Sequence, residues 1–217
     1  MKTFAVALAT ALTVVLCQPA MAADPLIVSW EDLLPDERPY HDPFLEMDYS
    51  QISDLAKLLR MERSADFEAD EAKKAEATEI RERLEAQGLD PDQLFVQRDI
   101  VMNQRRLAAT EPNTELLGKS VRLPGYLLPL EMVDQKAVEF LLVPTVGACI
   151  HTPPPPANQI VLVKYAEGFE VDGLYTPVWI SGKMRAQNQI QSLFLVDGET
   201  DVETTYLVDA LSVETYE

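Results

Sequence analysis

A cysteine and a histidine stand two positions apart in the stretch GACIHTPPPPANQ, residues 147–159. If this stretch is extended, Cys149 and His151 point to the same side, with their Cα atoms about 7 Å apart. A thiolate and an imidazole at that separation can both bind one cation, and zinc accepts both kinds of ligand. Two alternatives stay open: a thiol that the histidine activates for nucleophilic or redox chemistry, and a cysteine buried as a small apolar side chain.

The residues on either side of this pair are suited to hold it in place. Gly147 permits a positive φ or a close backbone approach just before the cysteine. Because proline fixes φ, the prolines after the histidine are predicted to form a stiff polyproline rod that presets the imidazole. These prolines are Pro153, Pro154, Pro155 and Pro156. The pattern therefore predicts a rigid Cys-x-His unit at the end of a strand.

A complete zinc site needs more ligands than this pair provides. The only other histidine is His41, in YHDPF, with Asp42 beside it. Cys149, His151 and His41 together with one carboxylate would form a four-ligand set, and zinc is the cofactor that suits such a set. The sequence has no glycine-rich phosphate loop, no nucleophile elbow and no helix-borne histidine pair. It therefore favours a protein that is not an enzyme.

Residues 1–22 resemble a secretory signal. Lys2 precedes an apolar run from Phe4 to Leu16, and Ala20-Met21-Ala22 is a small-x-small cleavage site. The apolar run is too short to span a bilayer. Cleavage after Ala22 therefore predicts a periplasmic protein with no transmembrane helix once the signal is removed.

Signal cleavage also changes the thiol content of the chain. The sequence has two cysteines, and Cys17 leaves with the signal. Cys149 is then the single thiol, so no intramolecular disulfide can form. A lipoprotein acylated at Cys17 is the alternative, although Leu16 is not the small residue expected before such a cysteine.

The chain is strongly acidic, with 18 basic and 36 acidic residues and a formal net charge of −18. Loss of Lys2 with the signal makes the mature chain one unit more negative. Such a surface repels phosphate backbones and anionic lipid headgroups, so we expect no nucleic-acid partner. It favours cations or basic proteins as partners, although the same charge also serves to keep a periplasmic protein soluble.

The mature chain has about 195 residues, enough for one domain with accessory segments. Residues 23–63 are predicted to form an N-terminal arm, because prolines interrupt their first half. Leucines that share one face predict a short helix over 53–61 at the end of this arm. The arm is expected to dock onto a core through three apolar side chains: Trp30, Leu33 and Leu34.

Residues 64–110 are predicted to form a charged helical segment. Ser64 is expected to cap the first helix, Gly88 to end it, and Asp90-Pro91 to start another. Two acid-before-base pairs at i,i+4 spacing are expected along the first helix: Asp70 with Lys74, and Glu79 with Arg83. The thin apolar face of this helix predicts a place on the surface, or alternatively a role in binding a partner.

Residues 111–217 change to short strands separated by turns, with no crossover helices between them. In VRLPGYLLPLE the apolar alternation breaks at Pro124-Gly125 and resumes on the other parity. Such a break predicts a β-bulge or bend at Gly125 that lets one strand serve both halves of a small barrel. We therefore predict a mainly β fold with a helical insert (α+β), in which residues 111–217 form a small OB-like antiparallel β-barrel.

The order of these segments resembles a bacterial family, domain of unknown function 3299. The similarity covers about residues 28–215 and includes WEDLLP, GKSVRLPGYLLPLE, PVWISGKM and, most specifically, the proline-rich Cys-x-His stretch followed by Asn158. The resemblance implies a secreted or periplasmic protein with an OB-like β-barrel and no established enzyme activity. It also implies association with ABC-type transport components, some linked to zinc supply. The helix over 64–86 is larger than the core of that family requires.

These observations lead to one hypothesis and two alternatives. The chain is predicted to be a periplasmic accessory or binding protein that binds a transition metal such as zinc, or that assists an ABC-type transport system. Its expected partners are transporter components or another periplasmic protein. The first alternative is a thiol-dependent redox protein or enzyme that uses Cys149 with His151. The second is a purely structural interaction module.

Overall fold

The computed structural model describes residues 24–147, 154–171, 173–195 and 198–216 of the chain. Within these ranges the protein is mainly β with a helical insert (α+β), as predicted from the sequence. The α-helices are α1 (Tyr49–Glu62), α2 (Glu71–Glu85) and α3 (Pro91–Thr110). The strands are β1 (Leu26–Ile27), β2 (Ser120–Val133), β3 (Lys136–Val143), β4 (Val161–Glu170), β5 (Thr176–Leu195) and β6 (Gly198–Thr215). The short 3-10 helices are η1 (Glu31–Leu33), η2 (Pro43–Leu45), η3 (Phe67–Ala69), η4 (Thr114–Leu116) and η5 (Ala157–Gln159).

The strands form one sheet in the order β1-β2-β3-β4-β6-β5, and β2 also pairs with β5. Strands β2, β3, β4, β6 and β5 therefore form a closed series of pairs, in which the last strand, β5, pairs with the first, β2. Strand β2 makes this possible because it pairs with β5 over residues 120–127 and with β3 over residues 126–133. One strand thus pairs with two neighbours along different parts of its length.

Two details of the predicted sheet are wrong. The pairing is not antiparallel throughout, because β4 runs parallel to β6 and β1 runs parallel to β2. The parallel pair follows from the topology: β5 pairs with β2, and β6 returns antiparallel to β5 and so lies beside β4 in the same direction. The expected bulge at Gly125 is also absent, since the β2–β5 register runs unbroken through Pro124 and Gly125, and β2 shifts register instead against β3, between Pro129 and Met132.

Gly125 has a packing role. A Cβ atom at this position would lie 2.7 Å from Cγ of Leu142, 2.9 Å from the Val143 carbonyl oxygen and 3.0 Å from the Trp30 ring. The missing side chain therefore lets the arm residue Trp30 lie directly against β2. There the Trp30 indole N–H donates a 2.8 Å hydrogen bond to the Pro124 carbonyl oxygen.

The core of the sheet follows the period of two that strands impose on their side chains. Its largest fully buried members include Leu123, Leu127, Phe140, Ile180 and Tyr206. The arm adds Leu33, which is fully buried in the same cluster, whereas Leu34 is 44% exposed and does not serve as the anchor that was expected.

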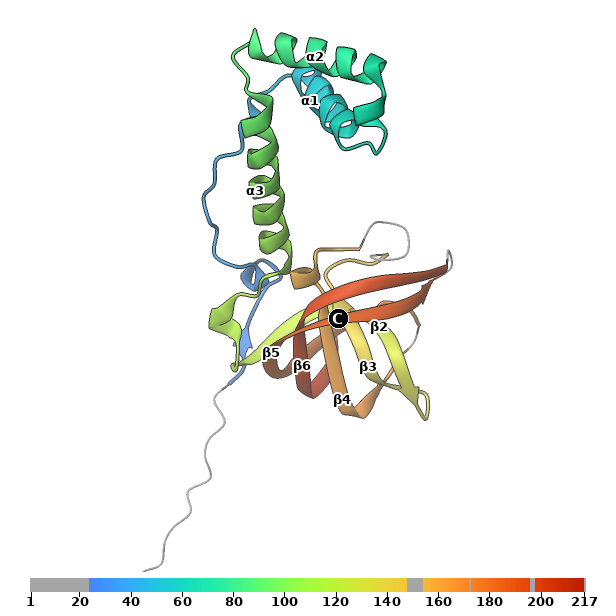
Figure 1. Ribbon diagram of the computed structural model, residues 1–217. Coiled ribbons are helices and arrows are strands. Elements are labelled where there is room, and N and C mark those ends of the chain that lie inside the picture. Colours follow the sequence, from blue (N-terminus) through green and yellow to red (C-terminus); the bar gives the residue numbers. More distant parts are fainter. Residues whose placement is uncertain (1–23, 148–153, 172, 196–197, 217) are drawn as a thin grey trace, which may run out of the picture.

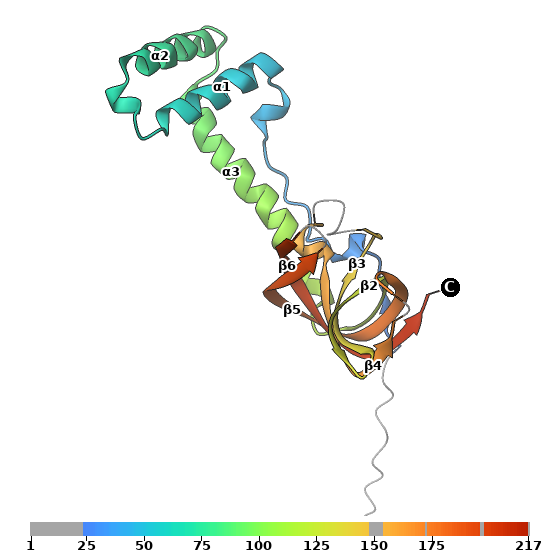
Figure 2. The ribbon, with the colours of Figure 1, turned by 90° about the vertical axis from the view of Figure 1, so that its right-hand side faces the viewer.

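A separate core joins the helices. Leu55 and Leu58 of α1 pack with Ile80 and Leu84 of α2 and with Leu94 at the start of α3. We call η2, α1, α2 and α3 as far as Arg105 the helical head. Figures 1 and 2 show that α1 and α2 lie at the end of α3 that is far from the sheet, with the arm running beside α3. The helical insert therefore projects from the sheet and does not cover it.

The helices begin and end partly as the sequence predicted. The helix expected over 53–61 is α1, which starts earlier because Asp48 and Gln51 form a capping box. Ser64 caps no helix: its hydroxyl donates to the Met61 carbonyl, and Asp70 caps α2 instead. The Asp90 cap with Pro91 at the first position of α3 is confirmed.

The ion pairs of α2 differ from the expected i,i+4 pairs. Arg83 reaches across to Asp54 of α1, with a 2.7 Å bond from Nε, and Lys74 pairs with Glu71 at i,i+3. The hydrogen bond between Arg83 and Asp54 is the main cause of two pKa shifts. It raises the pKa of Arg83 and lowers the pKa of Asp54 below its ordinary range. The charges of α2 therefore help to hold two helices together.

Candidate functional site

The proline-rich stretch ends beside the C-terminal end of α3. Pro155 and Pro156 lead into η5, and the Asn158 side chain there is fully buried. Its amide nitrogen donates to the Ala108 carbonyl oxygen at 2.7 Å and to the Glu111 carbonyl oxygen at 3.1 Å. The last carbonyls of a helix lack partners within the helix, so Asn158 satisfies groups that α3 itself leaves open. The described end of this stretch thus fastens α3 to the sheet.

Asn158→Ala is expected to destabilise the protein by about 2 kcal/mol, because two carbonyl oxygens at the C-terminal end of α3 lose the donor that the buried Asn158 amide provides. Asn158→Asp should cost more, since it places a negative charge against the negative end of the helix dipole. Urea unfolding followed by circular dichroism measures both effects. Asn188→Ala, at an exposed asparagine of β5, is the matched control. Equal stability of Asn158→Ala and this control would contradict the fastening role.

Tyr206 of β6 lies at the centre of the contact between α3 and the sheet. Its buried hydroxyl donates a 2.6 Å bond to the Leu33 carbonyl oxygen and accepts a 2.6 Å bond from the Asn113 backbone N–H. Next to it, the Thr205 hydroxyl donates to the Thr110 carbonyl oxygen at 2.8 Å. Burial raises the pKa of Tyr206 to about 12, although the Asn113 N–H acts in the opposite direction. The arm, the C-terminal end of α3 and the sheet therefore meet at one buried tyrosine.

Of the predicted metal ligands, His41 alone lies within the described residues. Cys149, His151 and Pro153 lie outside these residues, so their predicted roles stay predictions. His41 is described and exposed, on the arm. Its neighbour Asp42 caps η2 and binds Arg105 of α3 at 2.7 Å. In the part of the chain that the structure describes, no group of three His, Cys, Asp and Glu side chains is arranged to hold a metal ion.

The glycine before the predicted pair has the backbone conformation that the sequence suggested. Gly147 has φ of 81°, in the region that favours glycine, and nothing lies within 4 Å of where its Cβ would be. The chain therefore turns sharply, in open space, just before Cys149.

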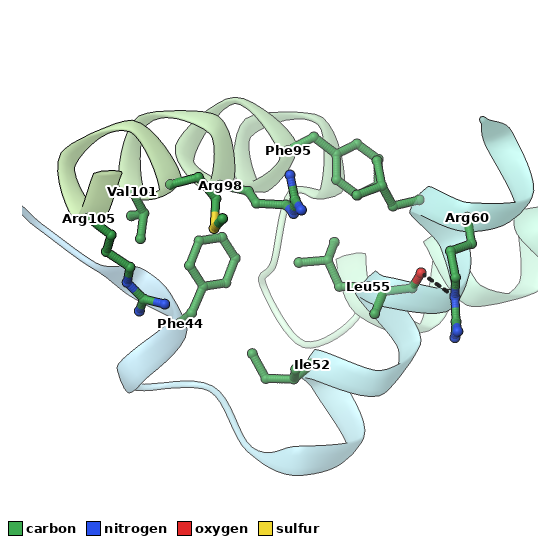
Figure 3. Close-up of a pocket in the computed structure, with 11 residues that line it drawn as sticks. Phe44, Ile52, Leu55, Arg60, Phe95, Arg98, Val101 and Arg105 are labelled. Carbon is green, nitrogen blue, oxygen red and sulfur yellow. Dashed lines mark hydrogen bonds between the residues drawn. The ribbon is translucent and has the colours of Figure 1, made fainter. Parts of the chain in front are cut away.

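A groove in the helical head is the feature that sequence reasoning missed. It lies between α1, η2 and α3 and has a volume of about 460 Å³. Figure 3 shows its side chains. The apolar part of the lining is formed by Phe44, Ile52, Leu55, Ala56, Leu59, Phe95, Val101 and Met102.

Three arginines also line the groove: Arg60, Arg98 and Arg105. No aspartate or glutamate is among the described residues that line it, although the whole chain has twice as many acidic as basic residues. On α3, Phe95, Arg98, Met102 and Arg105 follow one another at intervals of three or four residues, which places them on one face. This alternation of apolar and basic residues was the available sequence signal, and its helical period is what marks it.

The arginines of the groove differ in their contacts. Arg105 is held by Asp42, whose hydrogen bond is the main cause of the raised pKa of this arginine. Arg98 contacts only its exposed neighbour Asp99 among the ion pairs of the described chain, at 3.2 Å. The Arg60 Nε donates to the Ala56 carbonyl oxygen of its own helix. Exposed ion pairs between flexible side chains contribute little to stability, so Arg98 and Arg60 keep donors available for another anion.

Comparison with known proteins identifies the family. The model of the family described as Protein of unknown function (DUF3299) matches residues 30–215. The chain is also similar to the crystal structure of a DUF3299 family protein from Pseudomonas aeruginosa PAO1 at 2.45 Å resolution, with 26% sequence identity and a TM-score of 0.49, over 90% of this chain and 98% of that chain. No curated protein matches. The family match covers most of the sequence and confirms the resemblance to domain of unknown function 3299: the chain belongs to the DUF3299 family.

Proposed function

We propose that this protein is a periplasmic accessory protein that works by binding, with the groove of the helical head as its binding surface. The observation that carries the proposal is the open apolar groove between α1 and α3. An apolar surface of this kind is costly to leave in water, and ligand sites are commonly concave, apolar and furnished with a few polar groups. The groove has that composition.

In this proposal the sheet serves as the base that carries the helical head. The strands β2 to β6 pair in a row that returns to its start, which supports an OB-like barrel of five strands. Asn158 and Tyr206 fasten α3 and the arm to this base. The base is therefore suited to present the head at a distance, as Figure 2 indicates.

The periplasmic location rests on the signal sequence. Among the helices of the described residues, none is both long enough and apolar enough to cross a membrane. Cell fractionation of the full-length chain and of a variant that lacks residues 1–22 tests the location. Recovery of the full-length chain in the cytoplasm would contradict it.

Three finer hypotheses from the sequence stay predictions: zinc binding through Cys149 and His151, thiol chemistry at Cys149, and assistance to an ABC-type transport system. The Cys-x-His spacing motivates the first two, and the resemblance to the family motivates the third. Zinc content of protein purified from the periplasm, beside a Cys149→Ser variant, tests the metal hypothesis. Equal, negligible zinc in both would contradict it.

Ala56→Trp is expected to abolish function in the cell. Ala56 lines the groove and is exposed, so an indole there fills the groove without removing a buried contact. The variant should reproduce the growth defect of a deletion strain, in whichever condition reveals one, while accumulating to the normal level. Ala75→Trp, on the exposed face of α2, is the matched control and should behave as the unchanged protein. Full complementation by Ala56→Trp would overturn the proposal.

A further inference from the structure

We infer that the groove binds a single-chain anionic amphiphile, specifically a free long-chain carboxylate. This inference deepens the proposed function and rests on it, since it names the class of ligand for the same groove. Figure 3 shows the features that carry it: apolar side chains from α1, η2 and α3 around one space, with the Arg98 side chain projecting into it.

The dimensions of the groove suit one alkyl chain. Its lining on α3 runs from Phe95 to Arg105, a length of about 15 Å along the helix. The volume of about 460 Å³ lies within the range of roughly 300 to 1,000 Å³ that is usual for small-molecule sites. Leu55 and Val101 are buried at its floor, 5% and 2% exposed, and provide an apolar surface with no polar group for a ligand to satisfy. An alkyl chain needs no such group.

The arginines of the groove determine the chemistry of the ligand's headgroup. Arg98 and Arg60 come from α3 and α1, on the two sides of the groove, and each keeps donors that described contacts do not use. A guanidinium binds a carboxylate with paired, charge-assisted hydrogen bonds. A cationic or neutral headgroup would leave these donors without an anion. The groove therefore selects a carboxylate over an amine or an alcohol with the same alkyl chain.

The net charge of the protein decides between a small ligand and a macromolecule. A partner helix with several carboxylates, or an anionic membrane surface, would bring many negative charges against a chain of net charge −18. A ligand with one carboxylate meets the arginines with little of this repulsion. The groove thus favours a free amphiphile, even though the chain as a whole repels anionic surfaces.

Isothermal titration calorimetry of the mature chain tests the inference, with sodium octanoate, decanoate and dodecanoate below their micelle concentrations. We expect one site, with affinity that rises about fourfold for each added methylene until the groove is full. Dodecanoate should bind about tenfold or more tightly than dodecyltrimethylammonium or dodecanol, because only the carboxylate accepts bonds from the arginines.

Variants separate the charge from the shape of the groove. Arg98→Glu should weaken dodecanoate at least about tenfold, and Arg98→Lys should restore part of the loss, because it restores the charge. Arg106→Glu has the same charge change on α3, at an exposed position that does not line the groove, and should have little effect. Ala56→Trp should abolish binding with no change of charge. Far-UV circular dichroism of each variant checks that the helices form.

The outcomes are distinguishable from those of the proposed function. Dodecyltrimethylammonium that binds as tightly as dodecanoate, no binding of any carboxylate, or binding only to anionic vesicles would each overturn the inference. If no carboxylate binds while Ala56→Trp still abolishes function in the cell, the ligand class is wrong and the groove remains the binding surface. If dodecanoate binds as expected and Ala56→Trp still complements, the inference stands and the proposed function fails.

Discussion

Gly182→Ala is expected to destabilise the protein by about 3 kcal/mol or more, because the added methyl group would overlap with backbone atoms of the neighbouring strand. A Cβ atom on Gly182 would lie 2.3 Å from the Asp209 carbonyl oxygen and 2.8 Å from Cα of Ala210. Both atoms belong to β6, and the β5–β6 register shifts at this point. Neither strand can move aside without breaking the pairing, so the strain has no flexible side chain to absorb it.

Urea unfolding monitored by tryptophan fluorescence measures this effect through the midpoint of the transition. Ser181→Ala, at the preceding position of β5, is the matched control for a small side chain at the same place in the sheet. We expect its midpoint to stay close to that of the unchanged protein. If Gly182→Ala unfolds at the same urea concentration as this control, the close approach of β5 to β6 at Gly182 is wrong.

Tyr206→Phe is expected to destabilise the protein by about 2 to 4 kcal/mol, because both partners of the hydroxyl lose a hydrogen bond together. The Leu33 carbonyl oxygen loses its donor, and the Asn113 N–H loses its acceptor. The substitution removes one oxygen atom and keeps the ring, so the effect reports these bonds with little change in packing. Thermal and urea unfolding measure it. Tyr165→Phe, at a hydroxyl whose bond to Glu167 is exposed, is the control and should cost much less.

The pH dependence of stability gives the same prediction an independent test. The pKa of Tyr206 rises from 10.0 to about 12 in the folded protein. The hydroxyl therefore keeps its proton more readily in the folded chain than in the unfolded one, so its contribution is complete below pH 10 and is lost as the pH rises toward 12. The stability difference between the unchanged protein and Tyr206→Phe should shrink over that window. A constant difference up to pH 12 would contradict the burial of the hydroxyl.

The helices and strands could be predicted largely from local sequence. The cap and proline at Asp90-Pro91 start α3, and the alternating residues of VRLPGYLLPLE form β2, because capping and strand alternation depend only on neighbours in the chain. Ser64 misled for the same local reason. It is a good cap in isolation, but a turn and η3 follow it, and Asp70 starts α2.

The candidate site could not be predicted in the same way. Cys149 and His151 are reactive residue types that stand out in a sequence, whereas the groove is lined by ordinary apolar residues and three arginines. Phe44, Ile52 and Phe95 come from three elements, and nothing in the sequence shows that η2, α1 and α3 surround one space. The apolar and basic alternation along α3 was visible, but its meaning depends on what faces it.

By itself the sequence determined the family, the helical insert ahead of a strand-rich region and the cap of α3, since each depends on motifs or on short-range periodicity. Tertiary structure alone decided how these parts are used. The parallel pairing of β4 with β6, the packing of Trp30 against Gly125, and the burial of the Tyr206 hydroxyl between Leu33 and Asn113 all join residues distant in the chain. Such contacts form only where the whole fold brings their partners together, and a pattern of neighbours does not record them.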